Sequence, residues 1–267
     1  MTSPTKPRTP ALYHAGDGAP ASLGPPAAIA ITAGAVGTFY LLAGLLPREL
    51  ALVVGQLAQG SVALGAAWLF AAAGPRGAAH TLGLVRPRWI HVVAALLLGV
   101  SCWYIDLRIV DLLPGLDTDG GDAHALTDLV RDPSLAASLV TLALVPALCE
   151  ELVFRGVLAR GLTPSLPPVA AAAIAAVLFS AYHLSPLQAV PAFLLGLVLG
   201  VLALRARSIV PAMLAHALNN TFVIAVSRDD SPGGAASWLD GHPWGALAGA
   251  VLLAGTGLAI VVGARPA

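Results

Sequence analysis

The stretch SLAASLVTLALVPALCEELVFR, residues 134–155, decides the fold, because sixteen uncharged residues lead directly into two adjacent carboxylates. About 20 apolar residues cross the hydrocarbon layer as a helix, so this run is most of a membrane span. Ionisable side chains inside a span are costly and usually face a cavity, a partner or a substrate path. We therefore expect Arg155 to compensate Glu151, and two histidines and an asparagine from later spans to surround Glu150.

The composition of the chain is that of an integral membrane protein. Hydrophobic residues make up 57% of the 267 and charged residues 10%, whereas a soluble domain carries about 25% charged residues. Cys102 and Cys149 both fall in apolar runs, which favours small buried side chains over a disulfide. The sequence has no basic cluster typical of nucleic-acid binding. The lipid bilayer is therefore an expected partner, nucleic acid is not, and thirteen arginines against one lysine indicate a GC-rich, bacterial genome.

The apolar runs predict an all-α fold, a polytopic membrane helix bundle of about eight transmembrane helices. Residues 161–204 hold no charged residue and are too long for one helix, so the fifth and sixth spans are separated at Ser185-Pro186. The predicted spans are 27–46, 50–73, 89–105, about 134–160, 167–184, 187–204, 208–226 and 243–264.

The predicted spans divide the chain into four parts. Residues 1–26 hold six prolines and few large apolar groups, and they are predicted to form a disordered cytoplasmic tail. Residues 27–133 supply the first three spans and a polar outer loop over 106–133 that is rich in Asp and Gly. Residues 134–226 form the predicted catalytic core. Residues 227–267 hold a further outer loop and the last span.

The distribution of basic residues predicts the orientation of the bundle. With eight spans and the tail in the cytoplasm, ten of the fourteen Lys and Arg residues fall on the cytoplasmic side, Arg155 among them. Cytoplasmic loops carry an excess of Lys and Arg. We therefore expect a multi-pass protein, in a bacterial plasma membrane, with both termini in the cytoplasm.

The first motif pairs an acid with a base. Glu151 and Arg155 are four residues apart, acid first, which is the favourable order for an ion pair within a helix. Glu150 lies about 100° around the same helix, so the two carboxylates are expected to face different partners. A purely structural salt bridge at a helix end is the alternative interpretation of this cluster.

Two further motifs place polar side chains on later spans. Phe179 and His183 share one helix face, and so do His216 and Asn220, whereas Asn219 lies on another face and could simply bond to a neighbouring helix. Each histidine alone could be an ordinary satisfied polar residue. Together with Glu150 they are nearly all the strongly polar groups embedded in the second half of the chain. Lipid offers them no hydrogen bonds, so we expect them to meet one another.

The chemistry of such a cluster suits hydrolysis of an amide bond. A carboxylate beside a histidine can act as a general base toward water, and a histidine with an asparagine can donate hydrogen bonds to a developing oxyanion. The three motifs, E-E-x-x-x-R, F-x-x-x-H and H-x-x-x-N, resemble in order those of the CAAX-protease and bacteriocin-processing family (CPBP, or Abi family) of intramembrane endopeptidases. The resemblance covers about residues 134–226 and includes the flanking F-R-G-V-L and A-H-A-L-N-N.

The resemblance implies a role for each motif residue. Glu150 and His183 would activate the water, and His216 and Asn220 would form the oxyanion hole. Glu151 and Arg155 would hold the site in shape, with Phe179 as further structural support. The implied activity is that of a glutamic endopeptidase without a cofactor. Its substrate would be a membrane-associated or lipid-modified peptide or protein, reached from the cytoplasmic half of the membrane.

Two alternatives remain open at the level of the sequence. Glu150, His183 and His216 could bind zinc with a water as fourth ligand. The metal-independent mechanism is favoured because the H-E-x-x-H spacing is absent, and because Glu150 as a ligand leaves no general base. A non-catalytic transporter, proton relay or scaffold could also use buried Glu and His residues. The inverted repeats common in secondary transporters are not visible in the sequence.

Overall fold

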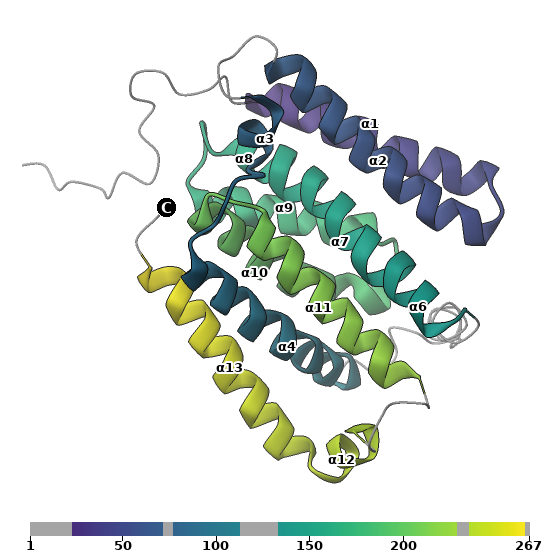
Figure 1. The fold of residues 1–267 in the computed structure, drawn as a ribbon, viewed down its shortest axis with the longest axis vertical. Helices are drawn as coiled ribbons and strands as arrows, with labels where there is room; N and C mark the ends of the chain where they lie inside the picture. The colour runs from purple at the N-terminus through teal and green to yellow at the C-terminus, as the bar shows by residue number, and fades with distance from the viewer. Residues whose placement is uncertain (1–22, 72–76, 113–132, 229–234, 265–267) are drawn as a thin grey trace, which may run out of the picture.

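The computed structural model describes residues 23–71, 77–112, 133–228 and 235–264, which form a bundle of packed helices (Figure 1). These ranges contain no strand. Among the described residues, seven helices are long and apolar enough to cross a membrane, and an eighth apolar helix is shorter. The predicted fold class, a polytopic all-α bundle, is therefore confirmed.

The N-terminal helices pair at one flank of the bundle. Helix α1 (Pro25–Leu45) and helix α2 (Arg48–Ala71) lie against each other, as Figure 1 shows in purple and dark blue. Two prolines begin α1. Proline is tolerated there because the first backbone N–H groups of a helix have no hydrogen-bond acceptor within the helix. Of the predicted tail, residues 1–22 lie outside the described part of the chain, and Pro25 and Pro26 belong to α1.

The third predicted span is longer than expected. After the short helix α3 (Gly77–Leu82), helix α4 runs over Trp89–Asp111 and so continues past Ile105. Asp106 thus lies within the helix and does not end it. Residues 113–132 of the predicted polar loop lie outside the described residues.

The central helix, residues 135–162, carries the decisive stretch and changes its winding four times. Ser134 caps its start by accepting a hydrogen bond from the Ala137 N–H. The segments η1 and η2 are π-helical, and such wider turns are rare and often lie at functional sites. Its segments are α6 (Leu135–Ser138), η1 (Leu139–Leu144), α7 (Val145–Glu150), η2 (Glu151–Ala159) and α8 (Arg160–Leu162).

Helices α9 (Pro168–Tyr182) and α10 (Pro186–Ala206) form the hairpin predicted from the Ser185-Pro186 break. Leu184 turns the chain with a φ of 51°, and the Ser185 hydroxyl accepts the Gln188 N–H to cap α10. Helix α9 has 15 residues, which makes it the short member of the eight apolar helices.

The C-terminal helices close the other flank. Helix α4 packs against both α11 (Val210–Ser227) and α13 (Pro243–Gly263), and the short helix α12 (Ala235–Gly241) precedes α13 (Figure 1). Cys102 and Cys149 are both free and buried, as expected. This arrangement places the central helix, α9, α10 and α11 between the two flanks, where their polar side chains are enclosed by protein.

Candidate active site

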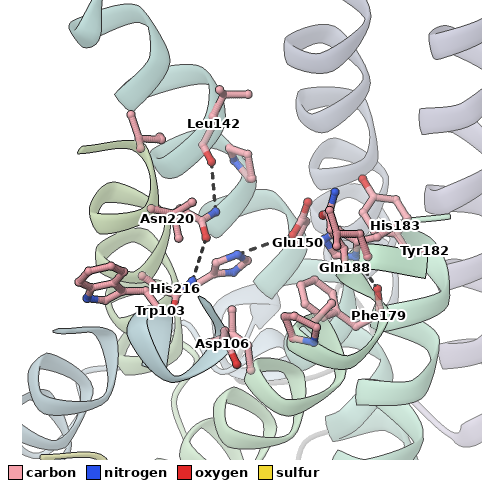
Figure 2. A pocket seen from close by; sticks show the side chains of 18 of the residues that line it. Trp103, Asp106, Leu142, Glu150, Phe179, Tyr182, His183, Gln188, His216 and Asn220 are labelled. Carbon is pink, nitrogen blue, oxygen red and sulfur yellow. Dashed lines mark hydrogen bonds and ion pairs between the residues drawn. The ribbon is translucent and has the colours of Figure 1, made fainter. Parts of the chain in front are cut away.

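A cavity of about 660 Å³ lies among α1, α2, α4, the central helix, α9, α10 and α11. Most of its wall is apolar, but Glu150, His183, His216 and Asn220 all line it. Figure 2 shows Glu150 and His216 facing one another, with Asn220 on one side and His183 on the other. The structure therefore brings together the four residues that the sequence placed in one site.

Glu150 is held by a side chain from the first half of the chain. The Nε2 atom of Gln56 donates a 2.7 Å hydrogen bond to Oε1 of Glu150, and both side chains are buried. The second oxygen, Oε2, lies 3.9 Å from Nε2 of His216. One carboxylate oxygen is thus fixed by an uncharged donor, and the other is directed toward the imidazole.

Glu151 contacts both a cation and the same histidine. Its Oε1 atom accepts a 2.7 Å bond from Nη1 of Arg155 and lies 2.9 Å from Nδ1 of His216. The predicted Glu151–Arg155 ion pair is confirmed, and Arg155 also donates to the Gly196 carbonyl at 3.1 Å. Both charged side chains are fully buried, at 0% exposure.

The expectation that Glu150 and Glu151 face different partners is wrong. His216 lies near both carboxylates, one with each ring nitrogen. A flat ring with a nitrogen on each of two edges can bridge side chains that point apart. The helix also changes from α to π at Glu151, so the regular 100° step no longer describes the two positions.

Phe179 orders the second motif. The Nδ1 atom of His183 lies 2.8 Å from the Phe179 carbonyl, which can only accept, so this nitrogen is the donor. The Phe179 ring meets both imidazoles edge-on. The distance between ring centres is 4.8 Å to His183 and 5.9 Å to His216. The Arg155 guanidinium lies 4.5 Å from the centre of the same ring. The aromatic side chain therefore separates the two imidazoles and covers the buried cation.

Asn220 is anchored to the central helix. Its Nδ2 atom donates a 3.1 Å hydrogen bond to the Leu142 carbonyl, in the π-helical segment η1. Among the described residues, the Asn219 side chain has no hydrogen bond to a neighbouring helix. It lines the same cavity and donates to Oδ1 of Asn220 at 3.4 Å.

Several polar residues of the cavity were missed by sequence reasoning. Gln59 donates to Oε1 of Gln56, and both glutamines donate to the Tyr182 hydroxyl. The Tyr40 hydroxyl donates to the Tyr182 carbonyl. These side chains form a hydrogen-bonded group behind Glu150. In the sequence, Gln56 and Gln59 are the only interruptions of the second apolar run. That interruption could have indicated that the second span contributes to the site.

Asp106 is a second acid in the cavity wall. It is part-exposed and lines the cavity from α4, with Trp103 one turn earlier on the same helix (Figure 2). Within the described ranges it has no hydrogen-bond or ion-pair partner. The sequence had assigned it to the start of the polar loop, because a carboxylate ordinarily ends a span.

The cavity lies near one end of the bundle. Its residues on α4 and α11 reach Val110 and Ser227, close to the ends of those helices at Asp111 and Ser227. With both termini in the cytoplasm, these ends lie on the outer side. Access from the cytoplasmic half and cytoplasmic termini are therefore expectations that cannot both hold.

Comparison with known families adds an independent observation. The model of the Rce1-like family, described as type II CAAX prenyl endopeptidase Rce1-like, matches residues 132–222. Residues 132–222 are therefore similar to the Rce1-like family. The match confirms the resemblance drawn from residues 134–226. A comparison with curated proteins gave no match, and neither did one with solved structures.

The Rce1-like segment covers 91 of the 267 residues and contains all three motifs. The match supports peptidase activity, and the apolar helices support an integral membrane protein. The residues that surround Glu150 from α1 and α2 lie outside the Rce1-like segment. The site is thus completed by helices that the family match does not cover.

Proposed function

We propose that the protein is an intramembrane endopeptidase that hydrolyses a peptide bond of a membrane-associated or lipid-modified peptide. The observation that supports this most is the convergence of Glu150, His183, His216 and Asn220 on one cavity, within a segment that matches an endopeptidase family. The cavity is large enough for a stretch of peptide, since small-molecule sites typically measure about 300–1,000 Å³.

Water activation is assigned to Glu150 and His183. His183 donates from Nδ1 to the Phe179 carbonyl, so the neutral ring keeps a lone pair on Nε2 that can accept a hydrogen bond from water. The Glu150 carboxylate takes the proton of that water as its oxygen attacks the carbonyl carbon. The Gln56 hydrogen bond holds one carboxylate oxygen in place, which leaves the other for the water.

Stabilisation of the oxyanion is assigned to His216 and Asn220. To donate from Nε2 while Nδ1 donates to Glu151, His216 must carry a proton on both nitrogens. Asn220 has one amide hydrogen on the Leu142 carbonyl and a second one free to donate. Donors fixed in a water-poor site stabilise a developing negative charge strongly.

Collapse of the tetrahedral intermediate completes the reaction. The carbon–nitrogen bond breaks, and the proton held by Glu150 passes to the departing nitrogen. The products are a carboxylic acid and an amine, and the Glu150 carboxylate is restored. Glu151 and Phe179 act by positioning His216 and His183, and Arg155 acts through its contacts with Glu151 and Phe179.

The zinc alternative requires three protein ligands about 2.0–2.2 Å from one point. Among the described residues, no three His, Cys, Asp or Glu side chains are grouped in this way. The contacts of Nδ1 with Glu151 in His216 and with the Phe179 carbonyl in His183 leave Nε2 of each ring available, so these contacts do not decide against a metal. As arranged, these side chains do not fit a zinc site, and no step of the mechanism passes through a metal.

The test is peptide cleavage by the purified protein, wild type against Glu150→Gln, with and without a chelator. We expect Glu150→Gln to lose roughly 10²–10⁴-fold in rate and the chelator to have no effect. Asp240→Asn is the matched control, because Asp240 is an exposed carboxylate on α12 outside the cavity. Equal turnover by Glu150→Gln and wild type would refute the enzyme hypothesis. Chelator sensitivity restored by zinc would replace the glutamate mechanism by the metal one.

A further inference from the structure

The cavity is built from the same end of every helix that runs toward it. Helices α1, α4 and α11 end at Leu45, Asp111 and Ser227. They contribute residues from their C-terminal parts, such as Tyr40 and Ser227 itself. We call this the cavity end of the bundle.

The antiparallel helices agree with this placement. Helices α2 and α10 and the central helix run away from the cavity end, and they contribute residues from their N-terminal halves, such as Leu52, Thr141 and Gln188. Glu150 lies near the middle of the central helix, with 15 residues before it and 12 after it. The cavity therefore extends from mid-depth to the cavity end.

The opposite end of the bundle is basic. Arg160 donates to the carbonyls of His80, Thr81 and Arg207, which ties the ends of α3, α8 and α10 together. Arg205 donates to the Val262 carbonyl at the end of α13. We call this the basic end.

The sidedness of the bundle follows from a count of cations. Arg155 is buried in the site and no longer counts as a loop charge. Of the other Lys and Arg residues that the structure describes, three lie in or beside the cavity-end connections, namely Arg48, Arg108 and Arg228. Five lie at the basic end, namely Arg86, Arg88, Arg160, Arg205 and Arg207. Lys and Arg near span ends favour the cytoplasm, which assigns the basic end to it.

We propose that the cavity opens on the non-cytoplasmic face of the membrane and that the substrate is a peptide segment presented from that side. The inference rests on the proposed endopeptidase function. It excludes cytosolic proteins with lipid-modified C-terminal tails as substrates. The class it selects is the exported peptide or the outer-leaflet end of a membrane-anchored protein.

Labelling of single cysteines tests the orientation without any need for activity. In a background of Cys102→Ala and Cys149→Ala, one variant carries Ser227→Cys at the cavity end and another carries Ser165→Cys. Ser165 lies between α8 and α9 at the basic end, and both serines are exposed. We expect a membrane-impermeant maleimide added to intact cells to label position 227 at once and position 165 only after permeabilisation. The reverse pattern, or equal labelling of both in intact cells, would overturn the proposal.

Cleavage in oriented vesicles tests access of the substrate. A charged, membrane-impermeant peptide that the detergent-solubilised wild type cleaves is added to right-side-out and inside-out vesicles. We expect cleavage by right-side-out vesicles, and by inside-out vesicles only after detergent. Cleavage confined to intact inside-out vesicles would overturn the orientation while leaving the endopeptidase intact. If no peptide from a diverse library were cleaved even in detergent, the proposed function itself would fail, and labelling would still decide the orientation.

Discussion

Gln56 donates a 2.7 Å hydrogen bond to Glu150 across 94 residues of sequence, and this bond joins α2 to the central helix. A hydrogen bond to a charged group contributes about 1.5–3 kcal/mol. Because the donor fixes one oxygen of the proposed base, its loss should affect the reaction more than the fold.

Gln56→Leu, which keeps the size of the side chain, should lower kcat by roughly 10- to 100-fold, the equivalent of that bond energy. The measurement is steady-state cleavage together with the melting temperature in detergent. Gln59→Leu is the matched comparison. Gln59 bonds to Gln56 and Tyr182 but not to Glu150, so its loss of rate should be smaller. A folded Gln56→Leu protein with wild-type kcat would contradict the positioning role.

Glu151→Gln should destabilise the protein, because Arg155 would keep its charge in a fully buried position. Breaking a buried ion pair in this way costs about 3–5 kcal/mol. The double variant Glu151→Gln, Arg155→Met should recover part of that loss, since it leaves no unpaired buried cation.

The two variants also separate stability from positioning. His216 loses the carboxylate beside its Nδ1 atom in both, so cleavage should stay low in the double variant even where its melting temperature recovers. Thermal unfolding and cleavage are measured on the same samples. Recovery of activity along with stability would show that Glu151 does not position His216.

Asp106→Asn should change which peptides are cleaved. A carboxylate without an ion-pair partner among the described residues attracts a cation that enters the cavity, with an energy of about 1–4 kcal/mol at close range. We expect kcat/KM to fall about tenfold for peptides with Lys or Arg near the scissile bond and to stay the same for neutral peptides. An equal fall for both kinds of peptide would mean that Asp106 supports the fold and does not select substrates.

Gly99→Ala should disturb the position of His216. A methyl group at Gly99 would lie 2.7 Å from the Ala215 carbonyl oxygen, which belongs to the backbone next to His216 and cannot rotate away. Helices α4 and α11 must then separate, which should lower both the melting temperature and the rate of cleavage. The control is Gly34→Ala on α1, where a methyl group meets nothing within 4 Å. Equal behaviour of the two variants would contradict close packing as the cause.

The course of the helices could be predicted from the sequence because apolar length and proline act locally. Pro186 marks the start of α10 and Pro243 that of α13, as expected. Asp106 was misplaced for the same reason, since a local rule reads a carboxylate as the end of a span. In the structure, helix α4 continues because the carboxylate borders a cavity and not lipid.

The members of the site were easier to predict than their contacts. Glu150, His183 and His216 stand out in apolar runs, because each needs a polar partner there. Which partner each finds depends on packing between distant helices. No pattern in the sequence indicates that Gln56 reaches Glu150, or that His216 lies between two carboxylates.

The shortness of α9 has a consequence for the lipid around the protein. Its 15 residues span only about 22 Å, against roughly 30 Å of hydrocarbon. A span this short is accommodated by local thinning of the bilayer, by snorkelling of flanking residues or by oligomerisation. His183 caps the end of α9, so thinning beside this helix would lie at the edge of the cavity. Thinning there would bring headgroups and water closer to the imidazole. A scissile bond would then have a thinner layer of acyl chains to cross before it reaches the site.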